Sequence, residues 1–216
     1  MKRIYLHPLP VRLWHWINAV SFVILIVTGL QIRYKDMMNL MAFRDAVDIH
    51  NTAGFILIGN FFLWLVYYIV TGKIRIYIPP LSVKKFVMGC IMQARYYGYG
   101  IFIGEANPHH GTPENKFNPL QKVAYLAIMA ILIPLQLATG LFLWDVKGFS
   151  SLINMAGGIK TVDTIHVFLF LFFTSFLFVH VYLATLGHTP TEHIKAMFTG
   201  YEELEESGHH AASSHS

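Results

Sequence analysis

The sequence predicts an all-α fold, a transmembrane four-helix bundle with a long cytoplasmic loop between its second and third helices and both termini in the cytoplasm. Of its 216 residues, 55% are hydrophobic and only 13% are charged, a balance that is unusual for a soluble globular domain. Four stretches also lack Asp, Glu, Lys and Arg, and each is long enough to cross a bilayer, which takes about 20 helical residues. These spans are residues 15–32, 50–71, 123–144 and 164–187.

The first span follows three basic residues, Lys2, Arg3 and Arg12. A secretory signal peptide begins in the same way, but its apolar core is usually shorter than this run and ends at an Ala-x-Ala cleavage site, which is missing here. We therefore expect the first span to be retained as a membrane helix.

The connection between the second and third spans, residues 72–122, is too long for a tight turn. Pro79 and Pro80 should end any continuation of the second helix. From Ser82 onward, basic residues are mixed with apolar and aromatic ones, which suits a helix on the cytoplasmic membrane surface. Residues 107–113 contain two prolines and are expected to form an irregular loop.

The sequence predicts one membrane domain followed by a C-terminal tail. Residues 1–200 are expected to form one integral membrane domain. Residues 201–216 are rich in Glu, Ser, Ala and His and predict a disordered tail. An alternative role for this tail is metal binding through its histidines, which are His209, His210 and His215.

The basic residues predict the orientation. Eleven Lys and Arg fall in the N-terminal segment, the 72–122 connection and the tail, against five in residues 33–49 and 145–163, which places both termini in the cytoplasm. The net charge of +4 is thereby explained by topology, and no nucleic-acid partner is expected. The single cysteine, Cys90, excludes a disulfide framework and a self-contained iron–sulfur cluster.

Four histidines lie within the spans, where coordinating side chains are uncommon and usually serve a functional site: His15, His50, His166 and His180. The topology pairs them, because His15 and His180 belong to the inner leaflet and His50 and His166 to the outer. His166 and His180 are 14 residues apart, which is about 21 Å along a helix and nearly on one face of it.

Two stacked pairs of imidazoles on facing helices suit two b-type haems, because each iron takes two axial ligands. Zinc fits less well, since the spans contain no Cys, Asp or Glu to complete four ligands. Gly29 lies 14 residues after His15, where a side chain would press against the outer macrocycle. Taken singly, His15 or His50 could instead sit at the membrane interface, and His166 could make a helix–helix contact.

Several short segments at the span ends and around the histidines are distinctive: His7-Pro8-Leu9-Pro10-Val11-Arg12, His15-Trp16, Thr28-Gly29, His50, Asn118-Pro119-Leu120-Gln121-Lys122, Thr139-Gly140, Ile165-His166 and His180-Val181-Tyr182. In these segments, and over nearly all of residues 5–200, the chain resembles the cytochrome b subunits of bacterial respiratory formate dehydrogenases, nickel–iron hydrogenases and thiosulfate reductases. These belong to the prokaryotic cytochrome b561-like superfamily.

The resemblance implies a di-haem electron-transfer subunit in the bacterial inner membrane. It would connect a periplasmic iron–sulfur subunit, with its catalytic subunit, to the quinone pool, which is menaquinone or ubiquinone. The family's ligand pattern maps onto His15 and His180 for the inner haem iron and onto His50 and His166 for the outer one, the same pairs that topology gives.

In the formate dehydrogenase relatives, the quinone sits by the cytoplasmic-side haem, near positions that match Asn118 and Gln121. These amides are three residues apart on the first turn of the third span and could reach quinone carbonyls. Asn118 also suits a helix N-cap before Pro119. Arg12 and Arg33 are candidates for binding haem propionates, or simply anchor helices at the headgroups.

Two other functions remain open on the sequence. A stand-alone cytochrome b561-like quinone oxidoreductase would use the same four ligands without an iron–sulfur partner. A haem-free membrane anchor for a catalytic complex would show no b-type absorption and would tolerate changes at all four histidines.

Overall fold

The computed structural model describes residues 2–77, 82–109, 118–185 and 190–204. Among these residues, four helical segments are long and apolar enough to cross a membrane, which confirms the prediction of four spans. The spans are α1 (Leu9–Arg33), α2 (Phe43–Val70), the combined segment Pro119–Trp144 and α7 (Ile159–Ala184). Each includes most of the predicted apolar stretch, and residues 186 and 187 of the fourth stretch lie outside the described residues.

The chain divides into two compact units. One unit consists of Ile17–Thr174, and the other consists of the described residues up to Trp16 together with those from Ser175 onward. Helices α1 and α7 contribute residues to both units.

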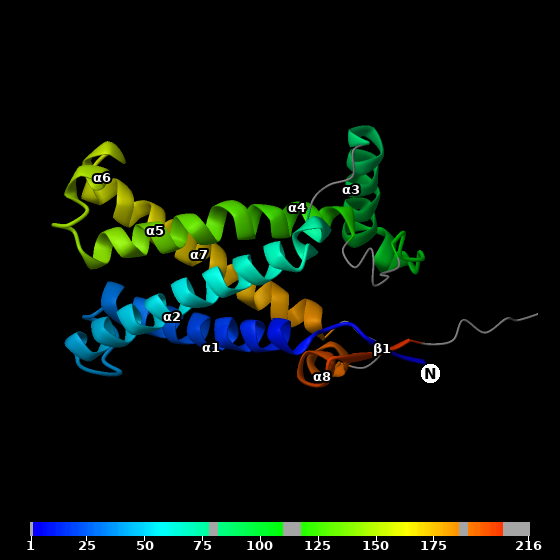
Figure 1. Cartoon of the computed structure of the whole chain (residues 1–216), viewed down its shortest axis with the longest axis horizontal. Helices are drawn as coiled ribbons and strands as arrows, with labels where there is room; N and C mark the ends of the chain where they lie inside the picture. The colour runs from blue at the N-terminus through cyan, green and yellow to red at the C-terminus, as the bar shows by residue number, and fades with distance from the viewer. Residues whose placement is uncertain (1, 78–81, 110–117, 186–189, 205–216) are drawn as a thin grey trace, which may run out of the picture. The chain divides into compact units, whose positions relative to one another are not determined.

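In the unit Ile17–Thr174, the four spans form a closed ring of neighbours. Helix α1 contacts α2 through Thr28 and His50, and α2 lies beside α5 (Ile133–Trp144), as Figure 1 shows. Helix α5 contacts α7 through Thr139 and His166, and α7 returns to α1 through the rings of Phe22 and Phe173, 5.5 Å apart. This unit is therefore a four-helix bundle.

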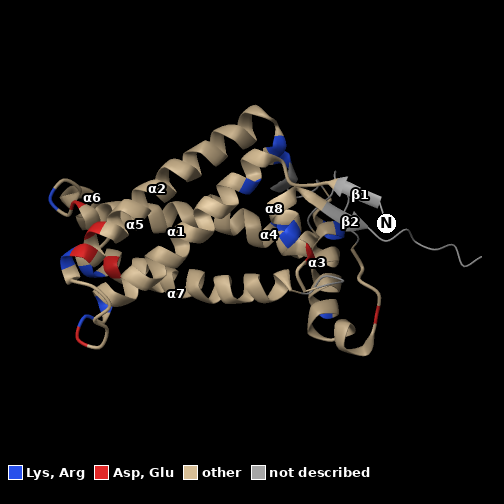
Figure 2. Ribbon diagram, turned by 90° about the horizontal axis from the view of Figure 1, so that it is seen from below, with Lys and Arg blue, Asp and Glu red and all other residues tan. Residues whose placement is uncertain are grey.

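The spans bury small and polar residues and expose large apolar ones. Side chains such as Leu63 and Phe168 face outward, whereas buried positions include Ser21, Asn60 and Ala53. This pattern suits helices whose outer surface contacts lipid, because close helix approach in a bilayer depends on small side chains and on polar contacts. In Figure 2 the helices of this unit carry no charge over most of their length, and its charged residues lie toward both ends, with Lys, Arg, Asp and Glu together at the end that carries α6 (Ser150–Met155).

Two tight connections close the bundle at that end. The Gln31 amide donates to Met38 O (2.6 Å) and accepts from Leu40 N (2.9 Å), which fixes the turn between α1 and α2. Helix α6 is followed by Gly157 and Gly158, both with φ of +94°, a conformation that residues other than glycine rarely adopt.

The third span is not a uniform α-helix. It consists of α4 (Pro119–Ala127), a π-helical turn η3 (Ile128–Leu132) and α5. The π turn immediately precedes Pro134, whose ring nitrogen cannot donate a backbone hydrogen bond.

The connection after α2 contains a 3-10 turn, η1 (Lys73–Tyr77), then α3 (Val83–Gly98) and a second 3-10 turn, η2 (Gly100–Ile103). Helix α3 confirms the helix expected after Ser82, and it lies crosswise to the spans in Figure 1. It packs on the start of α4, where a Cβ at Gly89 would come within 2.9 Å of Pro119 Cγ. Residues 107–109 are irregular, as expected, and the remainder of that predicted loop, like Pro79 and Pro80, lies outside the described residues.

The other unit contains a short antiparallel pair of strands, β1 (Lys2–Tyr5) and β2 (Tyr201–Leu204), which the all-α prediction did not include. Helix α8 (Glu192–Thr199) precedes β2, and Gly200 between them has φ of +89°. The first four residues of the predicted tail therefore pair with the N-terminus. The rest of that tail, with His209, His210 and His215, lies outside the described residues.

Candidate metal centres

The outer pair of histidines is brought together in the unit Ile17–Thr174. His50 and His166 lie in the third turns of α2 and α7, and their ring centroids are 6.4 Å apart with the planes at 67°. The pairing that topology predicted for the outer leaflet is therefore present in the structure.

The inner pair is brought together in the other unit. The ring centroids of His15 in α1 and His180 in α7 are 6.0 Å apart with the planes at 50°. Trp16 meets His15 edge-on at 5.3 Å, and Phe176 stacks on His180 at 5.8 Å. Aromatic rings thus contact both imidazoles of this pair.

Both separations fit two axial ligands of one iron. An imidazole nitrogen binds a metal at about 2 Å, and the ring centre lies roughly 1 Å beyond it, so two imidazoles on opposite sides of one iron have centres about 6 Å apart. The observed values of 6.0 and 6.4 Å agree with that arrangement.

The donor set also favours haem over a bare metal ion. Within the described residues, no group of three or more His, Cys, Asp and Glu side chains could hold a metal. Zinc in proteins takes three or four protein ligands, whereas haem supplies four equatorial nitrogens of its own and needs only two from the protein. Two isolated pairs of histidines are therefore suited to haem.

A threonine hydroxyl orients His50. Thr28 in α1 is 2% exposed, and its Oγ1 lies 2.7 Å from the carbonyl oxygen of Ile24 and 2.9 Å from His50 Nδ1. A carbonyl can only accept, so the hydroxyl proton points to Ile24 and the imidazole must donate to the threonine oxygen. His50 therefore carries its proton on Nδ1, which leaves the Nε2 lone pair for a metal.

The same arrangement recurs at His166. Thr139 in α5 is 3% exposed, and its Oγ1 lies 2.8 Å from Leu135 O and 3.0 Å from His166 Nδ1. In addition, the amide nitrogen of Gln136, which can only donate, is 3.3 Å from His166 Nε2. Both contacts place the imidazole proton on Nδ1 and make Nε2 the acceptor.

A glycine follows each of these threonines and lies against the same histidine. A Cβ at Gly29 would be 3.4 Å from His50 Cε1, and a Cβ at Gly140 would be 3.2 Å from His166 Cε1. Gly29 makes room for the imidazole of His50, and its expected role beside a macrocycle stays a prediction. The two Thr-Gly pairs therefore hold the two outer histidines from neighbouring helices.

The sequence alone predicted no role for Thr28, Thr139 or Gln136 at the histidines. A signal was available, because Thr28 precedes His50 by 22 residues and Thr139 precedes His166 by 27, and each threonine is followed by glycine. This repeat pairs each histidine with a Thr-Gly pair on the preceding span.

Asn118 and Gln121 form a capping box at the start of α4. Asn118 Oδ1 accepts from Gln121 N (2.8 Å), Gln121 Oε1 accepts from Asn118 N (3.1 Å), and Asn118 Nδ2 donates to Tyr97 OH (3.2 Å). Asn118 is only 3% exposed. The N-cap interpretation of Asn118 is therefore confirmed, and its quinone role stays a prediction.

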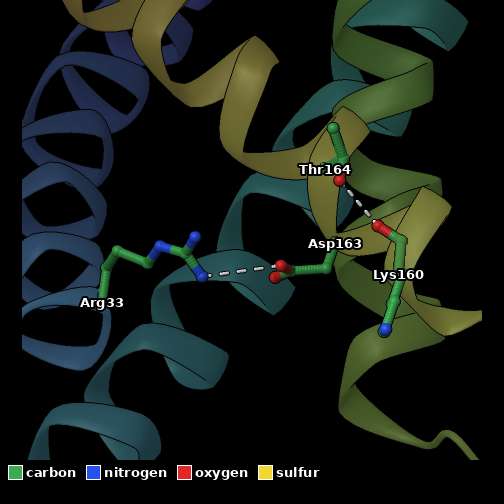
Figure 3. Close-up of polar contacts among 4 residues, drawn as sticks. All are labelled: Arg33, Lys160, Asp163 and Thr164. Carbon is green, nitrogen blue, oxygen red and sulfur yellow. Dashed lines mark hydrogen bonds and ion pairs between the residues drawn. The ribbon is translucent and has the colours of Figure 1, made fainter.

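The two candidate propionate residues contact other parts of the protein. Arg33 forms an ion pair with Asp163, N–O 3.6 Å, between side chains that are about half exposed (Figure 3). Exposed pairs of this kind contribute little to stability. Arg12 Nη1 donates to the Phe198 carbonyl at the end of α8. Their roles toward propionates stay predictions.

Comparison with known proteins bears out the resemblance. Residues 6–200 match the family model described as prokaryotic cytochrome b561. The chain is 35% identical over 202 residues to an Escherichia coli (strain K12) protein named cytochrome YdhU, covering 93% of this chain and 75% of that protein. It is 26% identical over 231 residues to a Cupriavidus necator protein named as a Ni/Fe-hydrogenase B-type cytochrome subunit, covering 95% of this chain and 89% of the other.

A third relative, from Azospira oryzae, is named as subunit YedZ1 of a protein-methionine-sulfoxide reductase. It is 27% identical over 198 residues, covering 86% of this chain and 93% of that protein. No solved structure matches the chain significantly. On the match over residues 6–200 and the similarity to YdhU, the chain belongs to the prokaryotic cytochrome b561 family, whose members are b-type cytochromes of electron transport.

Proposed function

We propose that this protein is the di-haem cytochrome b subunit of a respiratory complex in the bacterial inner membrane. It would carry electrons between an iron–sulfur subunit, with its catalytic subunit, on the periplasmic side and the membrane quinone pool. The observation that supports this most strongly is the presence of two separate histidine pairs at the spacing of axial haem ligands.

Haem b, which the family implies, supplies reversible one-electron chemistry when bound. The chain's part is to hold and orient it. His50 and His166 would supply the axial nitrogens of the outer haem, and His15 and His180 those of the inner haem. The apolar spans keep water and charge away from both pairs.

The relatives support a role inside a larger complex. Two of the proteins similar to this chain are named as subunits, one of Ni/Fe-hydrogenase and one of protein-methionine-sulfoxide reductase. A cytochrome subunit of that kind receives or delivers electrons and leaves the substrate chemistry to a partner. The positive-inside count supports a periplasmic position for the outer pair and the loops around α6, where the partner would dock.

For the quinone, Asn118 and Gln121 are the proposed polar contacts. Their position at the first turn of a span puts them at the depth where a quinone head meets water. The capping box occupies Asn118 Oδ1 and Gln121 Oε1, so quinone binding would have to use the remaining amide hydrogens.

The proposal is tested by purifying the tagged chain from its own membranes in mild detergent. We expect an iron–sulfur protein to co-purify, and one donor among hydrogen, formate and a reduced sulfur compound to generate reduced b-type absorption that added quinone reverses. His50→Ala should abolish this reduction, whereas the control His193→Ala, in α8, should not. A chain that purifies alone and is reduced by a small donor would favour the stand-alone oxidoreductase.

A further inference from the structure

The outer and inner histidine pairs differ in what holds their imidazoles. Both outer imidazoles bond through Nδ1 to a buried threonine, Thr28 or Thr139. By contrast, His15 Nδ1 is buried without a hydrogen-bond partner within the described part of the chain. The threonine contacts are thus a feature of the outer pair.

Each threonine is itself fixed. The Thr28 hydroxyl donates to Ile24 O four residues earlier, and the Thr139 hydroxyl donates to Leu135 O in the same way. Because the hydroxyl proton is committed to the backbone, the oxygen presents its lone pairs to the imidazole and works only as an acceptor. Neither threonine can rotate to donate without giving up its helix contact.

An acceptor on Nδ1–H has two consequences for a metal ligand. It fixes the tautomer in which Nε2 is free to bind, and it makes the imidazole a stronger electron donor. A stronger donor favours the ferric form of an iron over the ferrous form, and therefore lowers the midpoint potential.

We propose that Thr28 and Thr139 are positioning residues of the outer centre. Their hydroxyl oxygens accept from Nδ1–H of His50 and His166, fix Nε2 as the ligating atom, and hold the outer haem at a lower potential than it would have without them. With this lower potential, an electron at the outer haem would be favoured to pass to the inner haem. This inference rests on the proposed function, since it requires two bound haems.

The test uses substitutions that differ only in the hydroxyl. Thr28→Val and Thr139→Val keep the shape of the side chain and remove the hydroxyl acceptor, which leaves only the backbone of Leu25 for His50 and of Gln136 for His166, and Thr28→Ser and Thr139→Ser restore the hydroxyl. The control is Thr174→Val, because the Thr174 hydroxyl makes the same bond to Phe170 O (2.8 Å) but contacts no histidine among the described residues. Each purified protein is measured by haem quantitation and by an optical redox titration.

We expect each valine variant to raise the potential of one of the two haems and to leave the other unchanged. A tenfold change in the preference for ferric over ferrous iron would appear as a shift of about 59 mV. The serine variants and Thr174→Val should titrate like the wild type. If a valine variant instead loses one haem, its serine counterpart must regain it.

Unchanged potentials and haem content in both valine variants would overturn the inference, as would an equal shift in Thr174→Val or a serine variant that fails to restore the wild-type behaviour. These outcomes are distinct from failure of the proposed function, which would show as a wild-type protein without two haems.

Discussion

Gly140 and Gly29 are positions where an added methyl group would contact the ring of a histidine directly. A Cβ at Gly140 would lie 3.2 Å from His166 Cε1, closer than nearly all real Cβ contacts, and the ring cannot retreat freely because Thr139 holds its Nδ1. A Cβ at Gly29 would meet His50 Cε1 at 3.4 Å, an ordinary contact distance. The two glycines therefore differ in tolerance.

We predict that Gly140→Ala lowers the haem content of the purified protein by displacing His166, and that Gly29→Ala lowers it less. The matched control is Gly59→Ala in α2, where a Cβ would meet nothing within 4 Å. That control should keep its haem. Its free energy of unfolding should rise by about 0.5–1 kcal/mol, because alanine loses less conformational entropy than glycine in a helix. Pyridine haemochrome quantitation checks this, and equal haem in the Gly140 and Gly59 variants would contradict it.

Asn118 offers a test that separates a capping role from a quinone role. Asn118→Ala should destabilise the start of α4 by about 1 kcal/mol, because the Gln121 backbone N–H loses its acceptor. Asn118→Ser keeps a capping oxygen but loses the amide hydrogens.

If Asn118 contacts quinone, the serine variant, which keeps the cap but loses the bond to Tyr97 OH, should be more thermally stable than the alanine variant and should show slower reoxidation of its reduced haem by added quinone. Thermal melts and stopped-flow reoxidation measure the two effects. Wild-type reoxidation in the serine variant would leave Asn118 with its capping role alone.

The histidine pairs could be predicted from sequence because both topology and helical spacing constrain them. Their contacts could not. Whether Thr28 reaches His50 depends on how α1 and α2 are rotated about their axes, and in spans that are apolar nearly all round the sequence pattern does not fix that rotation. The same limit applies to Arg33 at the end of α1, whose ion pair with Asp163 depends on how the start of α7 is rotated about its axis.

At the scale of the helices, the spans followed from hydropathy, but their ends did not. Helix α1 begins at Leu9 rather than His15, because a helix does not stop where charge begins, and Arg12 bonds to the end of α8. The pairing of β1 with β2 joins residues about 200 positions apart, and its Glu-rich strand has no local pattern that would indicate it.

The π turn η3 is the other feature that the sequence left unspecified. It contains one residue more than an α-helix needs, as the bond from Ile133 N to Ile128 O shows, and it therefore sets the rotation of the helix that follows. That following helix carries Thr139 and Gly140 to His166.

We predict that deletion of Ala130, which is exposed in this turn, converts it to a regular helix and keeps the haem content of the wild type. Deletion of Leu137 removes a residue between Gln136 and Thr139, and should turn these two side chains by about 100° relative to each other. We expect it to reduce haem content. Equal haem loss in both deletions would show that the π turn does not work as a removable insertion.

At the scale of the whole molecule, the bilayer replaces the hydrophobic core of a soluble protein. Large apolar side chains face outward on every span, so stability depends on the membrane and on contacts between small residues. The predicted orientation rests on charge alone, since five Lys and Arg are expected on one side and eleven on the other.

The orientation can be checked with single cysteines in a Cys90→Ala background. Ser151→Cys, exposed in α6, should react with a membrane-impermeant thiol reagent in intact spheroplasts. Ser82→Cys, exposed before α3, should react only after the membrane is permeabilised. The opposite labelling pattern would reverse the topology.

The most direct test of the central claim is the number of haems per chain. Pyridine haemochrome quantitation on the purified protein, with a dithionite-reduced minus oxidised spectrum, should give two b haems. His166→Ala and His180→Ala should each lose at least one, while His193→Ala keeps both. A wild-type protein without haem, or one that keeps both haems in the His166 and His180 variants, would contradict the claim that these two pairs are haem ligands.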